Sequence, residues 1–126
     1  MKSKLVEEIK SNFIENAKQS EEAMDKNDYK SNNKAVNKLI RIYKKYEHDL
    51  SLAKEVLIPL LNYDDLIVRC WAATHCLTLN IEVEKAKIVL INTAELKKSL
   101  LSISASIVLE SWQKGELQIY KKSKKS

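Results

Sequence analysis

Residues 60–77 have the sequence LLNYDDLIVRCWAATHCL, and this segment is the most informative part of the chain. It reads as the end of one helix, a tight acidic turn at Asp64 and Asp65, and a second helix that is apolar almost all round. A helix without a polar face has to be covered on several sides. Because a short helix-turn-helix cannot bury itself, the segment predicts stacked pairs of helices.

The composition of the whole chain favours the same fold class. The 126 residues include one Gly and one Pro, whereas an all-β protein needs many of both for its turns. No long run alternates apolar and polar residues, as a half-buried strand does. The length is that of one domain with room for a substantial core. We therefore expect a single all-α domain over residues 1–120.

The spacing of apolar residues predicts six helices. They cover residues 3–26, 29–46, 50–61, 64 or 65–79, 82–93 and 98–114. The predicted caps are Asp28, Ser51 and either Asp64 or Asp65 at helix starts, and Asn80 and Gly115 at helix ends. We expect the third and fourth helices to form one antiparallel hairpin and the fifth and sixth another. In each hairpin the second helix is the more apolar, which indicates that the helix at 98–114 is largely buried.

The positive charge of the chain is concentrated at its end. The formal net charge is +5, and Lys121, Lys122, Lys124 and Lys125 lie in the last six residues. Without them, 18 basic side chains remain against 17 acidic ones, so residues 1–120 are nearly neutral. We expect residues 121–126 to be a disordered tail, solvated rather than bound to phosphates.

The helix at 29–46 combines an apolar side with a basic one. Its apolar side is expected to consist of Tyr29, Val36, Leu39, Ile40 and Tyr43, and its basic residues are Lys30, Lys34, Lys38, Arg41, Lys44 and Lys45. One interpretation is a phosphate-binding stripe. The favoured interpretation is a solvated surface whose cations pair with acids of the first helix. Salt-dependent binding of nucleic acid would overturn this preference.

The two cysteines are predicted to be buried thiols. Cys70 and Cys76 lie on one helix, separated by roughly 9 Å along its axis, whereas a disulfide requires Cα atoms within about 7 Å. This pattern is typical of a reducing compartment. Charged residues interrupt the start of the chain before a leader peptide could form, and no apolar run is long enough for a membrane. We expect a cytoplasmic protein.

The segment from Leu60 to Leu77 resembles the HEAT repeat, a helical hairpin with an Asp-rich turn. The resemblance rests on Asp64-Asp65, Val68-Arg69 and Ala72-Ala73, and a wider set that includes Trp71, His75 and residues 110–115 is similar to a bacterial HEAT-like domain family of unknown function. It implies an α-α superhelix of stacked hairpins and no particular activity. The second hairpin departs from the pattern, since Glu95-Leu96-Lys97-Lys98 replaces the Asp turn.

No recognisable catalytic or metal-binding pattern is present. The two histidines and two cysteines fit no zinc spacing, and one Gly cannot form a phosphate-binding loop. We therefore expect neither a metal nor another cofactor. A lone His75 four residues after Trp71 is more typical of a hydrogen-bonded packing residue than of a ligand or base. Arg69 is expected to reach an acid of its own turn or of the adjacent repeat.

Three functions are compatible with this pattern. The favoured one is a non-enzymatic protein-interaction module with another protein as partner, in one version an immunity- or antitoxin-type inhibitor. Its tentative binding residues are Arg69, Trp71, His75 and Trp112. The alternative is nucleic-acid binding through Lys34, Lys38, Arg41, Lys45 and the C-terminal lysines. An enzyme is the least favoured, because it would require a pocket around the same four residues with a shifted histidine pKa.

Overall fold

The computed structural model describes residues 2–96 and 99–120, with the side chain of residue 2 excepted, and these residues form an all-helical stack. The helices are α1 (Lys2–Asp25), α2 (Tyr29–Tyr46), α3 (Leu50–Leu60), α4 (Leu66–Leu79), α5 (Val83–Ala94) and α6 (Leu100–Gln113). The described residues contain no strand. The predicted all-α class and six helices are confirmed. The predicted lysine tail lies outside the described residues.

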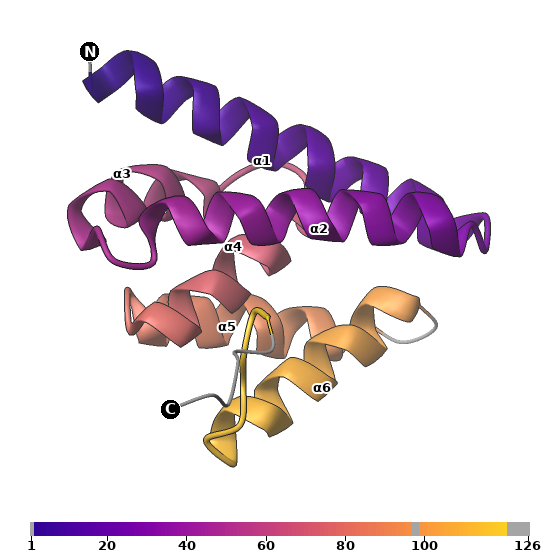
Figure 1. Ribbon diagram of the computed structural model, residues 1–126. Coiled ribbons are helices and arrows are strands. Elements are labelled where there is room, and N and C mark those ends of the chain that lie inside the picture. Colours follow the sequence, from indigo (N-terminus) through magenta and orange to yellow (C-terminus); the bar gives the residue numbers. More distant parts are fainter. Residues whose placement is uncertain (1, 97–98, 121–126) are drawn as a thin grey trace, which may run out of the picture.

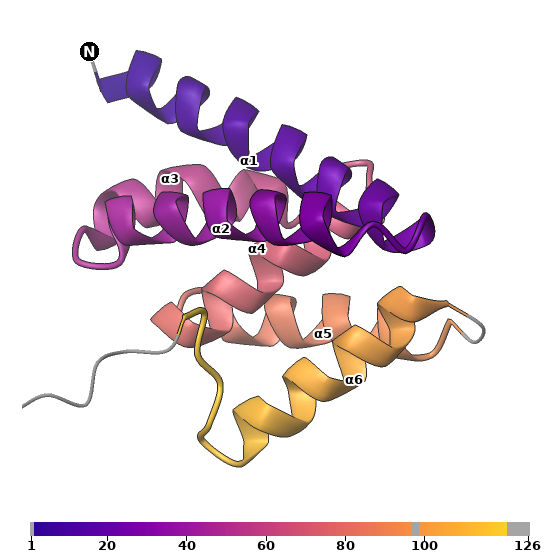
Figure 2. The ribbon, with the colours of Figure 1, turned by 45° about the vertical axis from the view of Figure 1, so that its right-hand side comes forward.

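The helices are arranged as successive layers. The α1–α2 hairpin lies on one side with α3 alongside α2, α4 crosses the middle, and α5 and α6 form the opposite side (Figures 1 and 2). Helix α1 packs against α3 and α4 as well as α2, so the N-terminal hairpin belongs to the stack. Helix α4 contacts α1, α3, α5 and α6. It is therefore covered on several sides, as its apolar sequence predicts.

Side-chain caps fix where several helices begin. The carboxylate of Asp28 accepts a hydrogen bond from the Ser31 amide at 3.1 Å, and that of Asp65 accepts one from the Ile67 amide at 3.2 Å. These caps satisfy amide groups that have no partner within the helix. The prediction of Ser51 as a cap is wrong. Asp49 holds that position instead, because its carboxylate lies 3.2 Å from the Leu52 amide.

Two helix ends confirm the predicted stop signals. Asn80 follows α4 in the left-handed conformation, with φ 61° and ψ 41°, and its amide bonds to carbonyl groups of the last turn. Gly115 has φ 73° two residues after the end of α6. A positive φ costs Gly little and Asn less than most residues. Both ends were therefore readable from local sequence.

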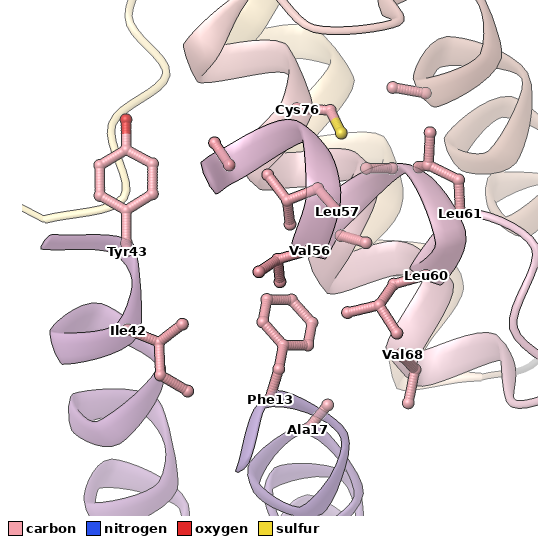
Figure 3. Packing of buried hydrophobic residues seen from close by; sticks show 14 of the residues in the cluster. Phe13, Ala17, Ile42, Tyr43, Val56, Leu57, Leu60, Leu61, Val68 and Cys76 are labelled. Carbon is pink, nitrogen blue, oxygen red and sulfur yellow. The ribbon is translucent and has the colours of Figure 1, made fainter. Parts of the chain in front are cut away.

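The densest part of the core lies where the first four helices meet. Figure 3 shows Phe13 of α1 between Ile42 of α2 and Val56 of α3, with Val68 and Cys76 of α4 nearby. Side chains from all four helices in this cluster are buried. The layers are thus held together by one continuous apolar core.

The buried side of α2 differs from the predicted one. The buried residues are Ala35, Leu39, Ile42, Tyr43 and Tyr46. Tyr29 is 74% exposed instead. It lies in the first turn of α2, at the outer tip of the α1–α2 hairpin, where no other helix covers it (Figure 1).

The prediction that α6 is largely buried is wrong. Its buried residues are Ser102 and Ala105, while Leu100, Ile103 and Ile107 are 50%, 57% and 56% exposed. Helix α6 is an outer layer, which packs against α5 and a smaller part of α4. The described chain after it turns back toward α2, where Tyr120 Oη donates to Glu47 Oε1 at 2.7 Å. Part of the outer side of α6 is therefore left half exposed by the described residues, and Ile107 lies beside the segment at 116–120.

Candidate functional site

The four predicted binding residues do not converge on one site. Arg69, Trp71 and His75 lie on α4, whereas Trp112 lies in the last turn of α6. Among the described residues, Arg69 forms no ion pair with an acid of its own turn or of a neighbouring hairpin, so the predicted salt bridge is not observed. Its Nη1 donates to the Tyr63 carbonyl oxygen at 2.6 Å, which holds the turn before α4. A charge-assisted bond to a turn carbonyl satisfies a backbone group that no helix partner reaches.

His75 is a buried packing residue rather than a surface group. Its side chain has no exposed area, and its Nδ1 lies 2.7 Å from Tyr46 Oη. The rings of Phe13, Tyr43, Tyr46 and Trp71 meet the imidazole edge to face. Burial lowers the pKa of His75 to about 3, so the ring is neutral at pH 7. The predicted packing role is confirmed, and a partner on the surface does not reach this side chain.

Trp71 is half-buried and forms one wall of an apolar pocket. Its Nε1 donates to Ser20 Oγ at 3.2 Å, and Ser20 Oγ donates in turn to the Ala17 carbonyl at 2.7 Å. The pocket has a volume of about 210 Å³ and lies where α1, α2, α4, α5 and α6 approach one another. Its other walls include Met24, Val36 and Val108. No local sequence pattern could predict this pocket, because its walls come from five different helices.

The remaining ionisable groups near Trp71 are poorly suited to chemistry. Cys70 and Cys76 are buried free thiols, and Cys70 Sγ lies 3.2 Å from Thr93 Oγ1. Burial raises the pKa of Cys70, and it raises the pKa of Cys76 to about 12. Both sulfurs are therefore protonated at neutral pH, whereas a nucleophile has to be a thiolate. Within the described residues, no group of three or more His, Cys, Asp or Glu side chains could hold a metal ion.

Trp112 packs at the edge of the last hairpin. It is half-buried, and Lys87 Nζ of α5 lies 5.3 Å from the centre of its ring. This geometry is a cation–π contact between neighbouring helices. It gives Trp112 a role in joining α5 to α6.

An exposed apolar surface on α6 was missed by the sequence analysis. Leu100, Ile103 and Ile107 follow one another at spacings of three and four residues, so they line one side of the helix, and we call them the α6 stripe. Ile88, Ile91 and Leu96 of the same hairpin region are also 41% to 56% exposed. Isolated exposed apolar residues are normal, whereas a row of them on one helix side is a candidate interaction surface.

A second surface feature is the basic side of α2. Lys34, Lys38, Arg41 and Lys45 are all exposed and succeed one another at spacings of three and four residues, and we call them the basic stripe. Helix α2 contains no acidic residue. The predicted pairing with acids of the first helix is not observed, since none of these four side chains forms an ion pair within residues 2–96 and 99–120.

Comparison of this chain with protein-family models, with curated proteins and with solved structures gives no match. The described helices also include none that is long and apolar enough to cross a membrane.

Proposed function

We propose that this chain is a non-enzymatic protein-interaction module of the HEAT-like helical-repeat type, and that the α6 stripe is its docking surface. The observation that carries the proposal is the exposure of Leu100, Ile103 and Ile107 on the outer side of the last helix. A terminal repeat that faces water normally has a polar outer side. An apolar outer side on an end helix is a surface that another chain can cover.

The partner surface that fits the α6 stripe best is one side of an amphipathic helix. Apolar residues spaced by three and four along a helix complement the same spacing on a second helix. Beyond the stripe, Glu110 and Lys114 form an ion pair at 3.6 Å, which supplies the polar rim of such a surface. An immunity- or antitoxin-type protein, which occludes a partner by covering it, is one form of this function.

The non-enzymatic part of the proposal rests on the state of the reactive groups. His75 is neutral and without exposed area, and burial keeps both cysteines as thiols. A general base or nucleophile has to reach its substrate in the reactive protonation state. His75 has the neutral form that a base needs but no exposed area, and the two cysteines are buried as well as protonated, so none of the three is poised to react with a substrate.

The test compares the proteins that the purified full chain and two of its variants capture from a lysate of the native host. In one, Ile103→Glu/Ile107→Glu places charge on the α6 stripe, and in a matched control, Lys38→Glu/Arg41→Glu reverses charge on the basic stripe. The proposal predicts a protein that is retained by the unchanged chain and by the control but is lost from the α6 variant. It is contradicted if the α6 variant retains every protein that the other two retain.

Nucleic-acid binding is a second candidate function, favoured by the basic stripe alone. Four exposed cations without acidic neighbours on their own helix can contact successive phosphates. A titration with duplex DNA at two salt concentrations tests it. Four phosphate contacts predict a slope of about −3 to −4 in log affinity against log salt, which Lys38→Glu/Arg41→Glu should reduce. Binding that is absent, or unchanged in this variant, rules out the basic stripe as a nucleic-acid site.

A further inference from the structure

The apolar pocket beside Trp71 is a hollow that is partly open to solvent and not a closed void of the core. A closed core rarely leaves gaps bigger than a water molecule, whereas an open hollow between helices can admit a ligand. This pocket measures about 210 Å³. Apolar cavities of about 150 Å³ stay dry and take up a molecule such as benzene. The space is therefore sufficient for one or two fused rings.

The chemistry of the walls defines what the pocket can bind. No charged side chain of the described residues lines it, and most of the lining is apolar, including Met24, Val36, Trp71, Leu101 and Val108. A charged ligand would lose its hydration there without gaining a partner. Aromatic rings, in contrast, pack favourably against an indole and against a methionine sulfur.

Several polar groups on the walls are already hydrogen-bonded within the protein, whereas the side chains of Asn32 and Ser104, which also line the pocket, form no hydrogen bond among the described residues. Trp71 Nε1 donates to Ser20 Oγ, and Thr74 Oγ1 donates to the Cys70 carbonyl at 2.8 Å. The Cys70 thiol is paired with Thr93 Oγ1. A ligand with many polar groups would find few free partners, so the pocket favours one without them.

We propose that the pocket lined by Trp71, Met24, Val36 and Val108 is a binding site for a small, uncharged aromatic molecule. Occupation fills the space between α6 and the α1–α2 hairpin without contact to the α6 stripe. The site is therefore independent of the proposed protein partner. The ligand is a free molecule with one or two rings and no ionised group.

The test uses indole as the probe and the methyl group of Met24 as the reporter. The chain has two methionines, so methyl-labelled protein gives two signals, and Met24→Leu identifies the one from the pocket. Bound indole shifts that signal through its ring current. We expect the shift to saturate at one indole per chain.

Two variants at neighbouring serines of α6 make the test specific. Ser104 lines the pocket, whereas Ser106 is exposed on another side of the helix. Ser104→Leu fills the space and should weaken indole binding at least tenfold, and Ser106→Leu should leave it unchanged. Thermal unfolding checks that both are folded. If Ser104→Leu does not fold, Val36→Phe fills the pocket from α2 and gives the same comparison.

Several outcomes would overturn the proposal. One is a Met24 shift that rises linearly with indole and never saturates. Another is equal binding to the unchanged and the filled proteins. The titration is also repeated with N-acetyl-tryptophanamide, which carries the same ring on a peptide backbone. If this compound binds and free indole does not, the pocket accepts a protein side chain instead of a small molecule. Saturable indole binding that is lost on filling supports the proposal.

Discussion

Helices α4 and α6 have the same length and are both rich in large apolar residues, yet they are buried to very different extents. Of 14 residues in each, eight are buried in α4 and two in α6. Helix α4 has neighbours in four other helices, whereas α6 is covered by α5 and a smaller part of α4. The apolar composition of a helix therefore determines how much of its surface has to be covered. Its place in the stack sets whether its own chain supplies that cover.

The largest expected difference between the two helices comes from the same truncation made in each. Leu77 of α4 is 4% exposed and Leu100 of α6 is 50% exposed. Leu77→Ala leaves a cavity in the core and should lower the free energy of unfolding by about 2–5 kcal/mol. Leu100→Ala should lower it by less than about 1 kcal/mol, because little surface is lost from the core. Urea unfolding of both variants measures the difference, and equal losses would contradict it.

Acid should weaken the α4 core through His75. The pKa of this ring is about 3 in the folded chain and about 6.5 when it is unfolded. The unfolded chain therefore binds more protons between these values, so stability falls as pH is lowered through that window. Between pH 7 and pH 5, His75 should lower the free energy of unfolding by about 2 kcal/mol. His75→Phe should remove this share of the pH dependence. A variant with the same pH profile as the unchanged chain would contradict the assignment.

The hydrogen bond between Tyr46 and His75 should appear as a coupling free energy between the two residues, and this effect is smaller than the two above. Tyr46→Phe leaves the imidazole without its partner in the core and should lower the free energy of unfolding by about 1–3 kcal/mol. With both changed, in Tyr46→Phe/His75→Phe, no buried polar atom of the pair remains. The double variant should therefore lose about 1 kcal/mol less than the sum of the single ones. A double-mutant cycle measures this coupling, and simple additivity would argue against the bond.

The features readable from the sequence are those that depend on residues close together in the chain. The helix at 29–46, the caps Asp28 and Asp65, and the end signal at Asn80 follow from local chemistry, and all are observed. Even there, the choice between Asp64 and Asp65 at the start of α4 stayed open, and the structure shows Asp65 as the cap. At the start of α3 the prediction of Ser51 overlooked Asp49, two residues earlier. Asp49 rather than Ser51 caps α3, and the sequence pattern permits both.

The features that could not be predicted depend on contacts between distant segments. The partner of His75 is Tyr46, 29 residues earlier. The partner of the Trp71 ring nitrogen is Ser20, 51 residues earlier. The exposure of Ile103 depends on which helices lie beyond α6, and no local pattern contains that information. The candidate surfaces therefore emerged only when the stacking order was known.

The measurement that tests the account most directly is the urea unfolding of Ile103→Glu/Ile107→Glu, followed beside Leu77→Ala. If the α6 stripe faces water in the isolated chain, its two carboxylates remain solvated. The free energy of unfolding should then change by less than about 1 kcal/mol. A loss as large as that of Leu77→Ala would mean that the stripe is part of the protein's own core, and would contradict its role as a docking surface.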